Sequence, residues 1–158
     1  DHEPSARFLF VTRHDPEALA RAAEAEGVAP DRLVVRAAVR PEVPGLLEAS
    51  DLSVFFIRPT FSKTASCPTK LGELMAVATP VVCNAGVGDV DDIVTSYGAG
   101  VVLPDMSRET LAEAAGRART LAALPSEPMV AGARDYFSLE RGVERYARLY
   151  ELLGDETS

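Results

Sequence analysis

Residues 60–84 read TFSKTASCPTKLGELMAVATPVVCN, and this stretch predicts a loop, a helix and a buried strand in succession. The helix is expected to begin at Pro68, because proline fixes φ and lacks the N–H group that a first helical position leaves unbonded. The apolar run from Thr79 to Asn84 is typical of a strand inside a parallel sheet. The stretch therefore predicts one βα repeat of an α/β fold.

The predicted helix has two different faces. At 100° per residue, one face carries the apolar side chains of Leu71, Leu74, Met75 and Ala78, which pack against a sheet. The opposite face places Gly72 and Ala76 between the polar residues Thr69 and Glu73. Because glycine and alanine leave space there, a flat ligand is expected to lie close to the helix backbone.

The start of this helix is a candidate anion site. Its first N–H groups have no partner within the helix, and the positive end of the helix dipole lies there. Glu73 lies five residues beyond Pro68, an axial rise of about 7.5 Å. That span suits a nucleotide, with its diphosphate at the helix start and its ribose at Glu73. The alternative is an ordinary surface helix with a solvated glutamate.

The charge distribution favours a small anionic ligand. The chain carries 16 basic and 24 acidic residues, a net charge of −8. From Leu52 to Gly72, however, it has no acidic residue and three cations, Arg58, Lys63 and Lys70. A local positive patch attracts a phosphorylated ligand, whereas the overall acidity argues against nucleic acid or an anionic membrane as a partner. A chance gap in the acidic residues is the alternative interpretation.

Length and composition predict a single domain over residues 1–158, since 47% of the residues are hydrophobic and no long apolar run is present. No transmembrane segment is expected, and the first residues have no secretory pattern, so the expected location is the cytoplasm. Cys67 and Cys83 match no metal spacing and are predicted to be free thiols. Cys83 is expected in the core. Cys67 is interpreted as a loop residue, at a helix start that lowers a thiol pKa.

The remaining chain repeats the same alternation of strands and helices. Five apolar strands are predicted, at 7–13, 33–39, 52–58, 79–84 and 99–103. Besides the helix from Pro68, helices are predicted from Asp15 to about Glu26, from Pro41 to Ser50, from Val90 behind a capping Asp89, from Ser107 through Leu121, and from Ser138 onward. Pro125 and Pro128 are expected to break the chain. The predicted fold class is α/β, a Rossmann-like parallel sheet with helices on both faces, which binds ligands beyond the carboxyl ends of its strands.

No catalytic residue is assigned from the sequence. No order of nucleophile, base and acid is recognisable, and His14 is interpreted as a surface residue. Asp89, Asp91 and Asp92 lie at the start of a predicted helix, where the dipole favours acidic side chains without any metal. The expected sets of catalytic residues and metal ligands are therefore empty.

With these residues described, the chain resembles the C-terminal, donor-binding domain of a GT-B glycosyltransferase of family 4. The resemblance rests on LLEASDLSVFFIRPTFSKTASCPTKLGELMAVATPVVCNAGVGDVDDIV at 46–94 and GAGVVL at 98–103. It implies a UDP- or GDP-type nucleotide sugar as the substrate and no cofactor. The residues that it assigns to the donor nucleotide are Lys63, Ser66, Cys67, Thr69 and Lys70 at the diphosphate, Glu73 at the ribose, and Val39, Arg40 and Pro41 at the nucleobase.

The chain departs from this family pattern in three ways. Ala65 stands where the family has a glutamate that touches the donor sugar. The first strand of the family domain with its glycine-rich loop is absent, and so is the N-terminal acceptor domain. A longer enzyme or another chain is expected to supply these elements, and the isolated chain is expected to be inactive. Two other functions stay open, a nucleotide-sugar epimerase and a non-catalytic α/β module that binds a partner protein.

Overall fold

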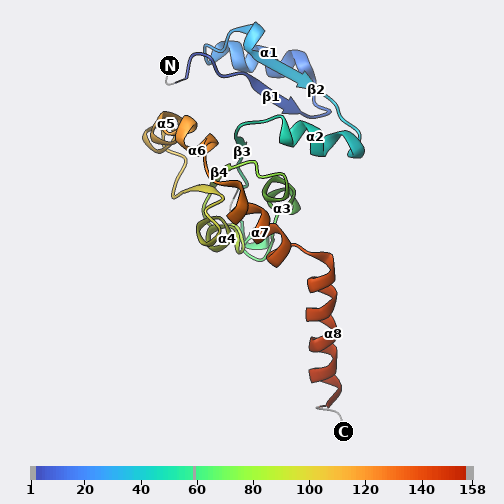
Figure 1. The fold of residues 1–158 in the computed structure, drawn as a ribbon. Coiled ribbons are helices and arrows are strands. Elements are labelled where there is room, and N and C mark those ends of the chain that lie inside the picture. Colours follow the sequence, from blue (N-terminus) through green and yellow to red (C-terminus); the bar gives the residue numbers. More distant parts are fainter. Residues whose placement is uncertain (1–2, 59, 156–158) are drawn as a thin grey trace. The chain divides into compact units, whose positions relative to one another are not determined.

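The computed structural model of the protein describes residues 3–58 and 60–155. It divides into two compact units, an N-terminal unit (Asp1–Leu46) and a C-terminal unit (Leu47–Ser158). Both contain parallel strands joined through helices (Figure 1), which confirms the predicted α/β class. The strands pair in two sheets, of two and three strands, rather than in one. The expectation of a single domain over 1–158 stays a prediction.

The N-terminal unit is a parallel strand pair with a crossover helix. Strand β1 (Phe8–Val11) pairs with β2 (Leu33–Arg36), and α1 (Pro16–Ala25) connects them. The predicted cap of α1 is confirmed, because the Asp15 carboxylate accepts a hydrogen bond from the Glu17 N–H at 3.0 Å. No residue of 3–46 is buried, and all four residues of β1 are exposed although all are apolar.

The C-terminal unit contains a three-stranded parallel sheet in the order β3-β4-β5, formed by Ser53–Phe55, Val81–Asn84 and Gly100–Leu103. Every residue of the central strand β4 is buried. Because successive side chains of a strand point to opposite faces, Val81 and Cys83 face one layer and Val82 the other. The helices of this unit cover both faces of the sheet, as predicted.

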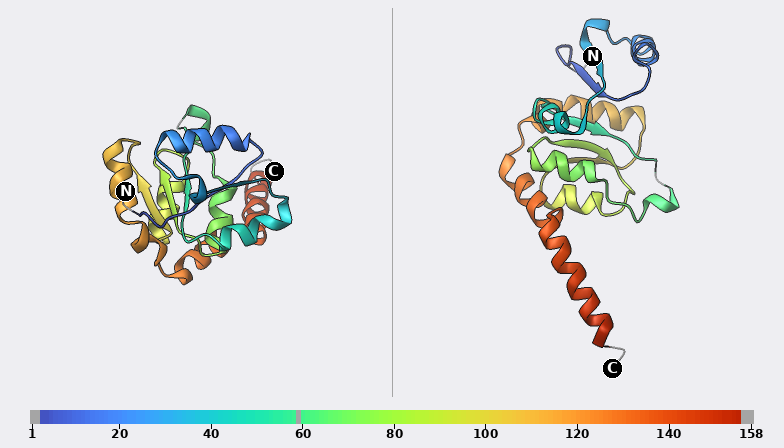
Figure 2. Two further views of the ribbon diagram at one scale, coloured as in Figure 1. Left: turned by 90° about the horizontal axis from the view of Figure 1, so that it is seen from above. Right: turned by 90° about the vertical axis from the view of Figure 1, so that its right-hand side faces the viewer.

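The two helical layers differ in size. The Val81 face packs against α3 (Thr69–Ala76), α4 (Val90–Ser96) and α7 (Ser126–Tyr136). The Val82 face packs against α5 (Arg108–Gly116) and α6 (Ala118–Ala122). Helix α2 (Val43–Glu48) precedes β3. Helix α8 (Leu139–Asp155) follows α7 and extends away from the rest of the C-terminal unit in Figure 1 and in the right-hand view of Figure 2.

Several predicted boundaries needed correction. Helix α3 begins at Thr69, so that Pro68 is its N-cap rather than its first residue, a shift within the usual uncertainty of helix ends. Ser107 caps its helix as expected, accepting from the Thr110 N–H at 3.2 Å, but the predicted long helix breaks at Arg117 into α5 and α6. Pro128 does not break the chain, because it lies in the first turn of α7, where proline is tolerated.

Candidate functional site

The candidate site lies where β3 and β4 end, at the edge of the sheet that binds ligands in parallel α/β folds. Asn84, the last residue of β4, is buried, and its side chain joins the two strand ends. Its amide oxygen accepts from the Ile57 N–H at 2.8 Å, and its amide nitrogen donates to the Ile57 carbonyl at 2.9 Å. Asn84 thereby fixes the point from which the chain leaves the sheet toward α3.

The segment before α3, residues 60–68, is called here the α3 loop. It folds on itself, because the Ser66 hydroxyl donates to the carbonyls of Ser62 and Lys63 at 3.3 Å each, and the Thr64 hydroxyl donates to the Phe61 carbonyl at 2.7 Å. The turn that follows β4 packs closely against it. A methyl group added to Gly88 would lie 2.1 Å from the Ser66 carbonyl oxygen. Local hydrogen bonds and this contact therefore hold the loop.

Six of the predicted site residues come together at the α3 loop and the first turns of α3. Ser66 is partly buried, and the other five are exposed: Lys63, Cys67, Thr69, Lys70 and Glu73. Pro68 makes no side-chain cap, so no side chain of the N-cap occupies the first N–H groups of α3. Two cations, open helix amides and an exposed carboxylate therefore lie on one short segment of the chain, from the α3 loop to the second turn of α3. It can bind an anion at one end and accept hydroxyl hydrogen bonds at the other.

The three remaining predicted residues, Val39, Arg40 and Pro41, belong to the N-terminal unit. They follow β2 and are exposed, with 60% of Val39 accessible. The Val39 N–H donates to the Glu42 carboxylate at 2.9 Å, and Glu42 also pairs with Arg36 at 3.0 Å. Their local conformation is therefore fixed, and their part in binding a nucleobase stays a prediction.

The open face expected on α3 is wrong in one respect. Gly72 is buried, and the ring of Phe137, just beyond α7, lies against it. A methyl group added to Gly72 would lie 2.6 Å from the ring carbon Cγ of Phe137. The small residue therefore makes room for a side chain of the protein itself. Beside this contact a groove of about 520 Å³ runs between α3 and α7, with Thr69, Glu73, Ala76 and Arg134 among its lining residues.

The two cysteines behave differently from each other. Cys83 is completely buried, which confirms its predicted place in the core, and burial raises the pKa of its thiol to about 12. Cys67 is exposed, but partial burial of the thiol and the nearby Asp89 carboxylate raise its pKa as well. The lowered pKa expected from the helix start is therefore wrong, because desolvation and a negative neighbour outweigh the dipole.

Three residues near the site were not identified from the sequence. Asp89 was expected to cap α4, but it makes no such cap, and its carboxylate accepts a hydrogen bond from the Tyr136 hydroxyl. Tyr136 is the last residue of α7 and Phe137 follows it. This helix was not predicted from the sequence. The apolar spacing of Met129, Ala133 and Tyr136 is the signal that indicates this helix. Among the described residues, no three His, Cys, Asp or Glu side chains gather as metal ligands.

A family comparison decides the class of this protein. The sequence profile of the family described as glycosyl transferases group 1 matches residues 1–120. The chain belongs to the group 1 glycosyltransferases. This membership confirms the predicted family and favours the glycosyltransferase interpretation over the epimerase and the protein-interaction module. A search of curated proteins finds no match to this glycosyltransferase chain.

Solved structures agree with the fold of this group 1 glycosyltransferase chain. WaaG, a glycosyltransferase involved in lipopolysaccharide biosynthesis, is 23% identical with a TM-score of 0.57 over 81% of this chain. AviGT4, a glycosyltransferase involved in avilamycin A biosynthesis, is 23% identical with a TM-score of 0.59 over 90%. The chain spans 32% of the WaaG chain and 43% of the AviGT4 chain. Among the described residues no helix is long and apolar enough to cross a membrane.

Proposed function

We propose that this chain binds the nucleotide-sugar donor of a glycosyltransferase, a UDP- or GDP-type sugar, at the α3 loop and α3. The observation that carries the proposal is the continuous arrangement of Lys63, Lys70, the first amides of α3 and the exposed Glu73 on a loop fixed by its own hydrogen bonds. The cations and amides hold the diphosphate, and the Glu73 carboxylate accepts hydrogen bonds from the ribose hydroxyls.

The same groups support the transfer step. As the bond between the sugar's anomeric carbon and the diphosphate oxygen breaks, negative charge builds on the departing diphosphate. Lys63, Lys70 and the helix amides stabilise that charge, which lowers the barrier. The new bond forms between the anomeric carbon and a nucleophilic atom of the acceptor, which the rest of the enzyme holds. The proton that this atom loses passes to the departing diphosphate. Glu73 orients the donor and takes no proton from it.

Calorimetry with UDP, GDP and ADP tests this site. Glu73→Ala is expected to weaken binding of UDP or GDP about tenfold or more, because hydrogen bonds to a charged group contribute about 1.5–3 kcal/mol. Glu113→Ala, which removes an exposed glutamate of α5, is the matched control and is expected to leave affinity unchanged. Equal affinity of wild type and Glu73→Ala would contradict the ribose role.

We further propose that an N-terminal half of the enzyme covers α8, because the chain spans only 32% of the WaaG chain and 43% of the AviGT4 chain. Five apolar residues of α8 recur at alternating intervals of four and three, the spacing of a helix that packs along one seam. All of them are more than half exposed: Leu139, Val143, Tyr146, Tyr150 and Leu153. In a complete glycosyltransferase, Tyr146→Arg with Tyr150→Arg is expected to split one thermal unfolding transition into two. A single unchanged transition would contradict this contact.

The cytoplasmic location stays a prediction.

A further inference from the structure

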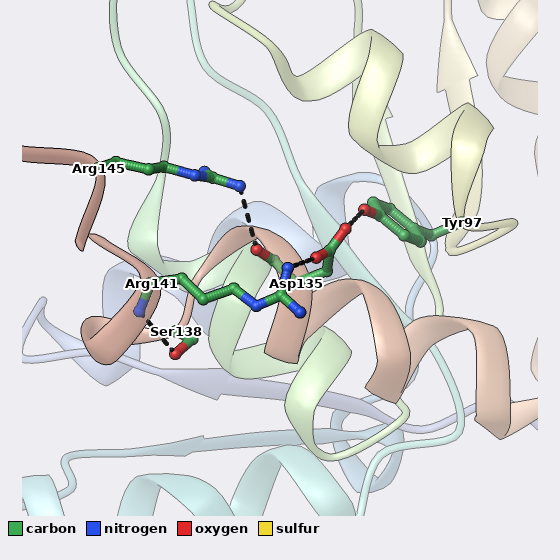
Figure 3. A network of polar contacts seen from close by, with 5 residues as sticks. All are labelled: Tyr97, Asp135, Ser138, Arg141 and Arg145. Carbon is green, nitrogen blue, oxygen red and sulfur yellow. Dashed lines mark hydrogen bonds and ion pairs between the residues drawn. The ribbon is translucent and has the colours of Figure 1, made fainter. Parts of the chain in front are cut away.

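Three consecutive residues at the end of α7 attach it to different elements. The Asp135 carboxylate accepts a hydrogen bond from the Tyr97 hydroxyl at 2.7 Å, just after α4, and pairs with Arg141 of α8. Figure 3 shows Asp135 between these two side chains, with the Arg145 guanidinium directed at its carbonyl oxygen, 3.4 Å away. The junction between α7 and α8 is therefore held from both sides.

Phe137 attaches this junction to α3. Its ring lies directly against the backbone of Gly72, so close that Cγ, Cδ1 and Cβ of Phe137 would all lie within 3.0 Å of an added methyl group. Glu73, the proposed ribose ligand, is the next residue of the helix. The position of the Phe137 ring therefore determines how closely α3 approaches α7, and with it the direction in which Glu73 leaves the helix.

Tyr136 attaches the same junction to the α3 loop through a second path. Its hydroxyl donates to the Asp89 carboxylate, while its ring lies 5.2 Å from that of Phe137 and carries the Arg145 guanidinium at 5.9 Å. Asp89 follows Gly88, whose backbone contacts the Ser66 carbonyl. The two aromatic residues thus reach both parts of the candidate site, the loop through Asp89 and the helix through Gly72.

We propose that Tyr136 and Phe137 are positioning residues for the donor site, which hold the α3 loop and α3 at the separation that a nucleoside diphosphate requires. This inference rests on the proposed function of that site. Neither side chain needs to touch the donor, since their effect passes through Asp89 and Gly72. Displacements of about 1 Å in a binding site are enough to reduce catalysis on the order of a hundredfold, so such a support has a measurable effect.

A size exchange between positions 72 and 137 tests the inference. Gly72→Ala forces the ring of Phe137 away from α3 and is expected to weaken binding of UDP or GDP, whichever the wild type binds, about tenfold. Combining Gly72→Ala with Phe137→Leu makes room for the added methyl group and is expected to restore most of that affinity. Tyr136→Phe, which removes only the hydrogen bond to Asp89, is expected to weaken binding about threefold to tenfold.

Leu121→Ala is the matched control. Leu121 is a buried residue of α6 that packs in the cluster of Val82 and Leu103, which is separate from the cluster that holds α3 and α7. Its truncation therefore destabilises the C-terminal unit at a place away from the proposed positioning residues. It is expected to lower the melting temperature as Gly72→Ala does while leaving affinity for the diphosphate unchanged. This comparison separates a positioning effect from a general loss of stability.

The outcomes distinguish the two proposals. If the wild type binds none of the nucleoside diphosphates, the proposed function is overturned and this inference with it. If the wild type binds, but Gly72→Ala lowers only the melting temperature, or the double variant binds no better than Gly72→Ala, the positioning role alone is overturned. A loss of affinity at Gly72→Ala that Phe137→Leu reverses, together with unchanged affinity in Leu121→Ala, establishes it.

Discussion

The two units contain similar strands but bury them very differently. In the N-terminal unit, β1 reads FLFV, and all four of its residues are exposed. In the C-terminal unit, β4 reads VVCN, and all four are buried. The difference lies in what covers the strand, because β4 has a strand on each side and helices over both faces, whereas β1 has one strand partner. An apolar run thus predicts a strand, but whether that strand is buried depends on the strands and helices that pack around it.

Hydrogen exchange provides the largest expected contrast between the units. Two-stranded sheets are marginally stable, so the amides of β1 and β2 should exchange through local opening of the N-terminal unit. The amides of β4 should exchange on the order of a thousandfold more slowly, a difference of about 4 kcal/mol in opening free energy. Mass spectrometry or NMR of the whole chain measures both. Equal protection would mean that the two units open together.

Truncation of one apolar side chain in each unit sharpens the comparison. Leu71→Ala removes a completely buried side chain from the core beside β4 and is expected to lower the free energy of unfolding by about 3 kcal/mol. Phe10→Ala in β1, where the residue is 43% exposed, is expected to lower it by about 1 kcal/mol. Urea denaturation followed by circular dichroism gives both values. A larger decrease in the free energy of unfolding for Phe10→Ala would show that another element packs against β1.

The end of α3 offers a change in the opposite direction. Ala78 has a φ of 57°, and the Thr79 N–H bonds to the Leu74 carbonyl at 2.9 Å, the arrangement that usually places glycine at this position. Ala78→Gly is expected to stabilise the C-terminal unit by about 0.5–1 kcal/mol, because glycine adopts this conformation without strain. Ala76→Gly, at the last residue of the helix, is the control and should destabilise, because glycine loses more backbone freedom than alanine when it is fixed there. Exchange from β1 should respond to neither variant if the units open separately.

The smallest expected effect depends on pH and also belongs to the C-terminal unit. The hydrogen bond to Asp89 raises the pKa of Tyr136 to about 12. An unfolded tyrosine releases its proton near pH 10, so this hydroxyl stabilises the fold fully below about pH 10, and the contribution is lost as the pH rises toward 12. Between these values wild type should lose stability more steeply than Tyr136→Phe in urea titrations. Parallel slopes would contradict the assignment.

The sequence predicted elements whose signals are local and failed where a distant side chain intervened. Asp15 and Ser107 cap their helices as predicted, since an N-cap depends only on residues two or three positions away. Asp89 did not cap α4, because its carboxylate bonds Tyr136, 47 positions along the chain. No local pattern contains that partner.

The candidate site shows the same limit. The loop, the helix start and the exposed Glu73 followed from residues 60–84, and their part in binding a donor stays a prediction. The space above Gly72 was assigned to a ligand, because nothing in that stretch indicates that Phe137 returns to fill it. Helix α7, which Phe137 follows, was not predicted because Pro128 was interpreted as a break. Proline is tolerated in the first turn of a helix, where Pro128 lies.

Helix α8 gives the junction a mechanical consequence. Its 17 residues form a helix about 25 Å long. It begins beside Tyr136 and Phe137, the residues that contact Asp89 and Gly72. A tilt of α8 by about 10° at its N-terminal end moves its C-terminal end by roughly 4 Å. Conversely, a force on the C-terminal end of α8 acts as a torque on Asp135 and its neighbours. A partner that binds the far end of α8 can therefore change the position of Glu73.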